Sequence, residues 1–229
     1  MLNYDDVIER VSDGFYDGFA PMGDDPYVFV ASEFLNSFRE REILCHLHGS
    51  IHFGYDPEIL KYEIVKWDDL SKAAESHNVL RPPTYASGEI ADVGPILSGL
   101  RKADKLNSVP YAYYHYALND TLASCPRLVV IGYGGNDTHI NFWIRQQKGH
   151  WGPQSRIAVV NRVSECEAAL KEGLLGQLLT DLAGAPIARW LDQARADSGV
   201  SLGSTFALFG DGFPMEGEDL DCLVKFLNS

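Results

Sequence analysis

The chain has 229 residues, 45% of them hydrophobic, and a formal net charge of −13 at pH 7. This length fits one large domain or one domain with a small insertion, and the hydrophobic fraction is that of an ordinary globular protein. Its lysines and arginines are scattered and outnumbered by acidic residues. Because a nucleic-acid binder needs a basic stripe, we expect no nucleic-acid partner, whereas a basic protein partner is compatible with the charge.

Membrane insertion and secretion are disfavoured as well. No run of about 18 apolar residues, the length that a membrane-spanning helix needs, occurs in the sequence. The start, Met-Leu-Asn-Tyr-Asp-Asp, is acidic and lacks the basic and apolar segments of a secretory signal. The four cysteines include no Cys-x-x-Cys pair for zinc, and we expect reduced thiols in a cytoplasmic protein.

Short apolar runs predict buried strands. They lie at residues 27–30, 42–47, 128–131, 157–160 and 205–209. The run at 128–131 is apolar at every position, which is typical of a parallel strand covered by helices on both faces. Helices are predicted at residues 113–123, after residue 137, and at residues 164–173, 174–196 and 217–227.

The order of these elements predicts an α/β fold. Strand and helix alternate from Pro126 to the C-terminus, which is typical of a doubly wound, Rossmann-like parallel sheet. Residues 55–107 contain no strong strand and a helical stretch around Ile96 and Leu100, so we interpret them as a small, mostly helical insertion. Residues 1–229 are expected to form a single domain that carries this insertion.

A glycine-rich turn, Gly132-Tyr133-Gly134-Gly135-Asn136-Asp137, follows the strand predicted at 128–131. Ligands bind at the carboxyl ends of strands in such sheets, where glycines allow close approach and a helix N-terminus offers free N–H groups. The turn lacks the complete GxGxxG and phosphate-loop patterns, so a plain tight turn remains an alternative. Asn136 or Asp137 is expected to cap the helix, and Tyr133 either stacks on a base or packs in the core.

A cluster of three histidines occupies residues 46–52. If this segment is a strand, His46 and His48 share one face. Three interpretations stay open. One is a hydrogen-bonded structural histidine, and another is a general base at the end of a strand. The third is a metal-dependent hydrolase whose His-x-His pair is completed, by assumption, by His139 and Asp137.

Four segments, taken in chain order, resemble the sirtuin-like domain family, in particular its bacterial, zinc-free branch. Asn3-Tyr4-Asp5 looks like the later part of the family's Thr-x-Asn-x-Asp motif, and Leu47-His48-Gly49-Ser50 looks like its catalytic histidine motif. Residues 132–141 are similar to that branch's Gly-Tyr-x-x-x-Asp-x-x-Ile-Asn segment. Val160-Asn161 resembles the strand-end Asn that contacts the adenosine half of the nucleotide.

This resemblance implies a domain that binds NAD as its substrate, breaks the bond between nicotinamide and ribose, and needs no metal. By the same resemblance, His48 is the general base, Asn3 positions the ribose or the attacking water, and Asp5 supports that arrangement. The residues implied on the adenosine side are Gly132, Tyr133, Gly134, Asp137 and Asn161. Such a cleavage passes through an oxocarbenium-like state, whose charge fixed dipoles can stabilise.

Two departures from the family matter. The chain starts at the Asn motif, so the family's first strand and its Gly-Ala-Gly-x-Ser loop are not among these residues. We therefore expect an N-terminally incomplete domain whose parallel sheet exposes an apolar edge. No cysteine pair lies between His48 and Leu128, where the protein-deacylating sirtuins carry zinc.

Two functional hypotheses follow. The first is an enzyme that hydrolyses NAD, as an antiviral defence effector that works as a homo-oligomer or with a defence-system partner. The second is a catalytically silent module that binds a nucleotide or another protein. An upstream extension carrying the glycine-rich loop would favour the enzyme, and a true start at Met1 would favour the silent module.

Overall fold

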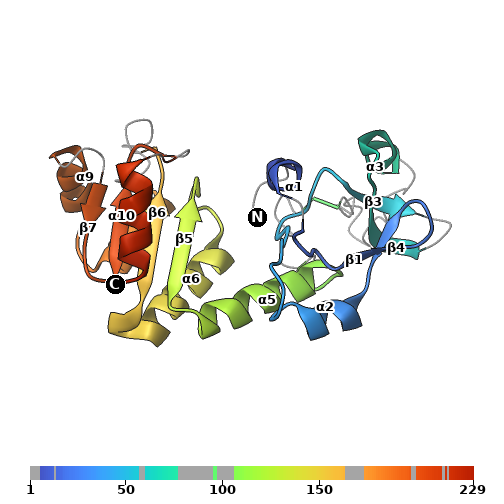
Figure 1. Cartoon of the computed structure of the whole chain (residues 1–229), viewed down its shortest axis with the longest axis horizontal. Helices are drawn as coiled ribbons and strands as arrows, with labels where there is room; N and C mark the ends of the chain where they lie inside the picture. Colours follow the sequence, from blue (N-terminus) through green and yellow to red (C-terminus); the bar gives the residue numbers. More distant parts are fainter. Residues whose placement is uncertain are drawn as a thin grey trace, which may run out of the picture. The chain divides into compact units, whose positions relative to one another are not determined.

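The computed structural model describes residues 6–12, 14–56, 60–76, 95–96, 106–162, 173–196, 200–212, 215 and 217–229. The chain divides into two compact units, Met1–Leu118 and Asn119–Ser229, and Figure 1 colours their elements along the sequence. The helix α5 (Tyr111–Ser124) contains the boundary between them. None of the described helices is long and apolar enough to cross a membrane.

Unit 1 is built on a small antiparallel sheet. In the order of the sheet, its strands are β1 (Phe19–Pro21), β2 (Tyr27–Phe29), β4 (Leu60–Lys66) and β3 (Phe53–Asp56). Each neighbouring pair runs antiparallel. Among the described residues of this unit, the helices apart from α5 are α1 (Val7–Val11), α2 (Ala31–Ser37) and α3 (Leu70–Ser76).

Aromatic side chains form the core of unit 1. The ring of Phe29, at the end of β2, lies 5.3 Å from that of Phe34 on α2 and 5.7 Å from that of Tyr114 on α5. Phe34 and Tyr114 are both completely buried. The hydroxyl of Tyr114 also donates a hydrogen bond of 2.7 Å to the carbonyl oxygen of Asp17. One aromatic cluster therefore packs the sheet against α2 and α5. Packed rings stabilise a fold by more than their buried area alone would predict.

Unit 2 contains the parallel sheet. In the order of the sheet, its strands are β5 (Arg127–Ile131), β6 (Arg156–Val160), β8 (Phe206–Phe209) and β7 (Val200–Leu202). The first three run parallel, and β7 is antiparallel to β8. The helical segments that the structure describes here are α6 (Thr138–Trp151), the short 3-10 turn η1 (Gly152–Gln154), α8 (Leu174–Ala183), α9 (Ile187–Ala196) and α10 (Glu218–Leu227).

Helices cover the central strands of this sheet on both faces. On one face, Leu223 and Phe226 of α10 join the core cluster of β6 and β8. On the other face, the ring of Trp190 on α9 lies 4.9 Å from that of Phe206 on β8. Because side chains alternate along a strand, the two faces of β8 are filled by different helices. This is the arrangement expected of a Rossmann-like α/β sheet.

The prediction that the strand at 128–131 is covered on both faces is wrong. The strand exists as β5, but it lies at the edge of the sheet, and Val129 and Ile131 are 36% and 52% exposed. These residues pair in register with Ala158 and Val160 of β6, which α10 does cover. An apolar sequence pattern is the same for a central strand and for an edge strand, so it could not distinguish them.

The strand predicted at 42–47 is also absent. Within it, Ile43 forms an isolated bridge with Tyr16, and the rest is a loop in which Leu44, His46 and Leu47 are buried. The interpretation of residues 55–107 as having no strong strand is wrong as well, because β4 occupies Leu60–Lys66. Lysines and Glu63 interrupt its apolar residues, the pattern of a strand with one solvated face. Helices are confirmed over most of 113–123, 174–196 and 217–227.

The remaining predictions of elements and boundaries have three different outcomes. The strands predicted at 27–30, 157–160 and 205–209 are confirmed as β2, β6 and β8. The helix predicted at 164–173 falls almost entirely outside the described residues. The extent of the insertion at 55–107 and the single-domain boundaries stay predictions.

The core of unit 2 gives a first test. Leu179 on α8 is completely buried, whereas Leu174 at the start of the same helix is 42% exposed. We expect Leu179→Ala to lower the free energy of unfolding by about 2–5 kcal/mol, because it removes packed methyl groups and leaves a cavity. Leu174→Ala is the control and should cost less than about 1 kcal/mol. Urea denaturation followed by circular dichroism measures both, and equal costs would contradict the packing described here.

Candidate functional site

The loop of residues 132–137 leaves the carboxyl end of β5 and leads into α6. The N–H of Gly132 donates a 3.0 Å hydrogen bond to the carbonyl oxygen of Val160, so the pairing with β6 continues to the first residue of the loop. Gly132 and Gly135 have φ angles of +62° and +73°. Both angles lie in the left-handed region that glycine adopts without strain, which explains two of the three glycines in this turn.

Close packing is a second reason why residue 135 is a glycine. A Cβ atom built on it would lie 2.6 Å from the Cα atom of Leu175 on α8, whereas one on Gly134 would meet nothing closer than 3.6 Å. The backbone of the loop therefore packs directly against the first turn of α8. Gly134 is the glycine of this loop for which neither space nor a positive φ angle requires the absence of a side chain.

Tyr133 packs inside unit 2 and braces the loop. The residue is 8% exposed, and its hydroxyl donates a 2.8 Å hydrogen bond to Oδ1 of Asn141 on α6. Nδ2 of Asn141 in turn donates 2.7 Å to the carbonyl oxygen of Gly135. Burial raises the pKa of the Tyr133 hydroxyl far above its ordinary value of 10.0, so this group stays a donor. Of the two alternatives left by the sequence, packing in the core is the one observed.

Asn161 supports the same loop from the end of β6. Its Nδ2 donates a 3.2 Å hydrogen bond to the carbonyl oxygen of Tyr133, and its Oδ1 accepts one of 3.0 Å from the N–H of Arg162. Two side chains thus bind carbonyl groups of the loop. Asn141 on α6 binds that of Gly135, and Asn161 at the end of β6 binds that of Tyr133. A contact between Asn161 and a nucleotide stays a prediction.

Asp137 occupies the N-cap position of α6, with φ −95° and ψ 96°, but its side chain makes no capping hydrogen bond. Asp137, one of the two residues predicted to cap the helix, is thus the N-cap residue, but its carboxylate does not supply the expected capping hydrogen bond. The first N–H groups of α6 are not saturated by that carboxylate, and the helix dipole places partial positive charge there. Gly132, Tyr133, Gly134, Asp137 and Asn161 are all brought together around this one loop.

The histidine segment lies in unit 1, within a loop instead of a strand, so the expectation that His46 and His48 share a strand face is wrong. His46, His48 and Ser50 are 1%, 4% and 1% exposed. Gly49 has a φ angle of +106°, and a Cβ atom on it would lie 2.5 Å from the carbonyl oxygen of Pro95. Glycine is therefore required at this point by both conformation and space.

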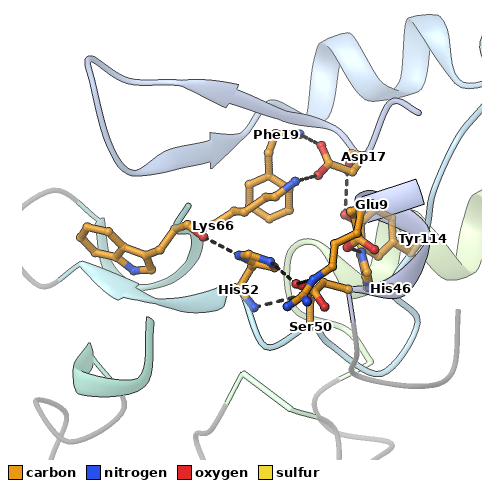
Figure 2. Close-up of polar contacts among 11 residues, drawn as sticks. Glu9, Asp17, Phe19, His46, Ser50, His52, Lys66 and Tyr114 are labelled. Atoms are coloured by element: carbon orange, nitrogen blue, oxygen red, sulfur yellow. Dashed lines mark hydrogen bonds and ion pairs between the residues drawn. The ribbon is translucent and has the colours of Figure 1, made fainter. Parts of the chain in front are cut away.

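Glu9 of α1 contacts this loop (Figure 2). Asp6, the N-cap residue of α1, contacts it as well. Nε2 of His46 lies 2.7 Å from Oε1 of Glu9, and Nε2 of His52 lies 3.4 Å from Oδ2 of Asp6. Burial raises the pKa of Glu9, but the contact with His46 outweighs it, so the pKa of this carboxyl lies below its ordinary value of 4.5. Sequence analysis did not identify Glu9, because no local pattern links it to a residue so far along the chain.

Cys45, the residue before His46, has a thiol that ionises poorly. Part of its surface is exposed, yet the protein atoms around the thiol raise its pKa to about 12. The predicted site residues Asn3 and Asp5 lie outside the described residues.

The fold and these loops define a class of protein before any comparison. A parallel sheet with a braced glycine loop at the carboxyl end of a strand is typical of Rossmann-like nucleotide-binding proteins. A family model described as a SIR2-like domain matches residues 2–175. The chain therefore belongs to the SIR2-like domain family, whose members generally use NAD, and the resemblance found in the sequence is confirmed. None of the curated proteins matches the chain.

The two neighbouring glycines of the loop provide a matched test. Gly135→Ala should destabilise unit 2 by more than about 1 kcal/mol, because alanine is strained at a positive φ angle and its Cβ atom would overlap the backbone of α8. Gly134→Ala should be tolerated. Thermal unfolding of both variants checks this, and a fully stable Gly135→Ala protein would contradict the loop geometry.

The Glu9 carboxylate predicts a dependence of stability on acid. Since its pKa is lower in the folded protein, its contribution to folding is complete above pH 4.5 and is lost as the pH falls through the folded pKa. Glu9→Gln should therefore destabilise the protein at pH 7 and lose less stability than the wild type between pH 5 and 3. Urea midpoints at a series of pH values measure this, with the exposed Glu33→Gln as control. Parallel curves for Glu9→Gln and wild type would contradict it.

Proposed function

We propose that this SIR2-like domain hydrolyses NAD to nicotinamide and ADP-ribose. The observation that carries the proposal is the loop after β5. Its backbone is fixed by Asn141 and Asn161, and it leads into a helix N-terminus that the Asp137 carboxylate does not cap. Rigid N–H groups of this kind suit the pyrophosphate and ribose of a dinucleotide. The family match spans this loop and the His48 loop.

The reaction breaks the bond between the ribose C1′ atom and the nicotinamide nitrogen. The bonding electron pair leaves with nicotinamide, which becomes neutral and therefore needs no strong acid. Water forms the new bond to C1′ and gives up a proton, so that the products are nicotinamide, ADP-ribose and one proton. In this proposal, His48 accepts the proton as general base, and its burial limits competition from bulk water.

The other residues take supporting roles in the proposal. Asn3 orients the attacking water or the ribose, and Asp5 supports Asn3. Gly132 and Gly134 let the nucleotide approach the backbone, and Asp137 accepts a hydrogen bond from a ribose hydroxyl. Tyr133 acts through its backbone, because its hydroxyl is committed to Asn141.

Asn161 completes the adenosine side in this proposal. Its amide already binds the carbonyl oxygen of Tyr133, so its effect on the nucleotide includes fixing the shape of the loop. Membership of the zinc-free branch and a role as an antiviral defence effector, with a second copy or a defence-system protein as partner, belong to the same proposal. They rest on the sequence resemblance.

A second candidate function is a catalytically silent interaction module. The exposed apolar residues Val129 and Ile131 on the edge strand β5 favour it, since such edges pair with other chains. The two candidates differ in a single measurable quantity, the release of nicotinamide. An interaction module would bind NAD or a protein without releasing nicotinamide.

His48→Ala tests the enzyme. We expect the wild type to release nicotinamide from NAD and the variant to lose at least about 100-fold in kcat, the usual contribution of a general base. His150→Ala, which alters an exposed histidine on α6, is the matched control and should keep full activity. Chromatography of the products measures both nicotinamide and ADP-ribose. Unchanged release by His48→Ala would remove His48 from the mechanism, and NAD binding without release by the wild type would favour the silent module.

A further inference from the structure

We infer that Glu9 and Asp6 are positioning residues, which clamp the loop carrying His48 onto α1 through His46 and His52. The inference rests on the proposed role of His48. The clamp has two contacts, one on each side of His48 in the sequence, and both come from a single turn of α1 and its N-cap residue (Figure 2).

The contact between Glu9 and His46 is the inner one. Their atoms lie 2.7 Å apart, and the side chains are 21% and 1% exposed. Among the described residues, neither oxygen of the Glu9 carboxylate has a hydrogen-bond partner of good geometry, so the close approach to His46 is its main polar contact. A buried carboxylate is costly unless it meets a positive or donating group, so Glu9 holds its position only while His46 is beside it. The ring of His46 is fixed from another direction by the ring of Phe53, 5.6 Å away.

The contact between Asp6 and His52 is the outer one. Nδ1 of His52 lies 2.8 Å from the carbonyl oxygen of Trp67, so both nitrogens of this ring face acceptor oxygens. Nε2 of the same ring lies 3.4 Å from Oδ2 of Asp6, which also accepts a 2.8 Å hydrogen bond from Nε of Arg10. His52 is therefore held between α1 and the residue that follows β4. The backbone N–H of His52 also donates a 3.3 Å hydrogen bond to Oγ of Ser50, so the clamp includes a second residue of the loop.

These contacts bear on catalysis through position alone. In the sequence, Asp6 directly follows the Asn3-Tyr4-Asp5 motif, and His48 lies between the two clamped histidines. The proposed reaction needs Asn3 and His48 in a fixed relation to the same water and ribose. A displacement of about 1 Å can cost about 100-fold in rate, so an anchored loop is a functional requirement as well as a stabilising one.

Three variants separate these roles. Glu9→Gln keeps the size and an accepting oxygen, Glu9→Ala removes both charge and contact, and Glu33→Gln alters an exposed glutamate on α2 as the matched control. With NAD as substrate, we expect kcat to fall about tenfold or more in Glu9→Ala and less in Glu9→Gln, while KM changes less than twofold. Glu33→Gln should match the wild type. Equal kcat in Glu9→Ala and wild type would overturn the inference, as would a loss that merely follows the fraction of folded protein.

The outer contact has its own control. Asp6→Asn removes the carboxylate that faces both His52 and Arg10, whereas Arg10→Gln removes the guanidinium alone. We expect Asp6→Asn to lower kcat and Arg10→Gln to leave it within twofold. Equal losses in the two variants would overturn the outer half of the clamp.

A measurement without NAD keeps the clamp testable apart from the enzyme. In protein labelled with ¹³C at the histidine Cε1 position, the resonance that disappears in His48→Ala is that of His48. Glu9→Ala should shift this resonance in folded protein, and Glu33→Gln should not. A shift with no nicotinamide release by the wild type would retain the clamp and reject the proposed function. An unmoved His48 resonance in folded Glu9→Ala would reject the clamp whatever the activity.

Discussion

The hydroxyl of Tyr133 connects the glycine loop after β5 to α6. It bonds to Asn141 on α6, Asn141 bonds back to the carbonyl oxygen of Gly135, and Asn161 holds the carbonyl oxygen of Tyr133 itself. Because each group is buried or partly buried, breaking one bond leaves its partner unsatisfied in a low-dielectric interior. A glycine loop, which is entropically costly to order, thereby acquires a single conformation.

In unit 1, the loop that carries the histidines is contacted by the acidic side chains of Glu9 and Asp6. Residues 46–51 of this histidine loop belong to no strand, and ring contacts and acidic side chains at α1 contact that loop. Neutral hydrogen bonds in one unit and acid–histidine contacts in the other are different ways to fix a functional loop. The first is insensitive to pH near neutrality, and the second weakens as the carboxylates gain protons.

The sequence predicted most of unit 2 and less of unit 1. Continuous apolar runs identify β6 and β8 because burial on both faces leaves no other pattern, and the order of the motifs identified the family. The edge position of β5 was not predictable, because it depends on which strands lie beside it. In unit 1, β4 was missed because charged residues interrupt it, and the loop at 42–47 was mistaken for a strand because it is rich in buried apolar residues although its pairing is limited to one isolated bridge. The contact of Glu9 with His46 arises from tertiary structure alone.

Cys45 lies next to this acid–histidine pair, and its raised pKa has a consequence for the redox chemistry of the loop. With a pKa of about 12, little of this thiol is ionised at pH 7, and the thiolate is the form that attacks peroxides and disulfides. Oxidation to a sulfenic acid or a mixed disulfide at this position is therefore slow. The raised pKa of Cys45 thus lowers the reactivity of the thiol next to the His46–Glu9 contact.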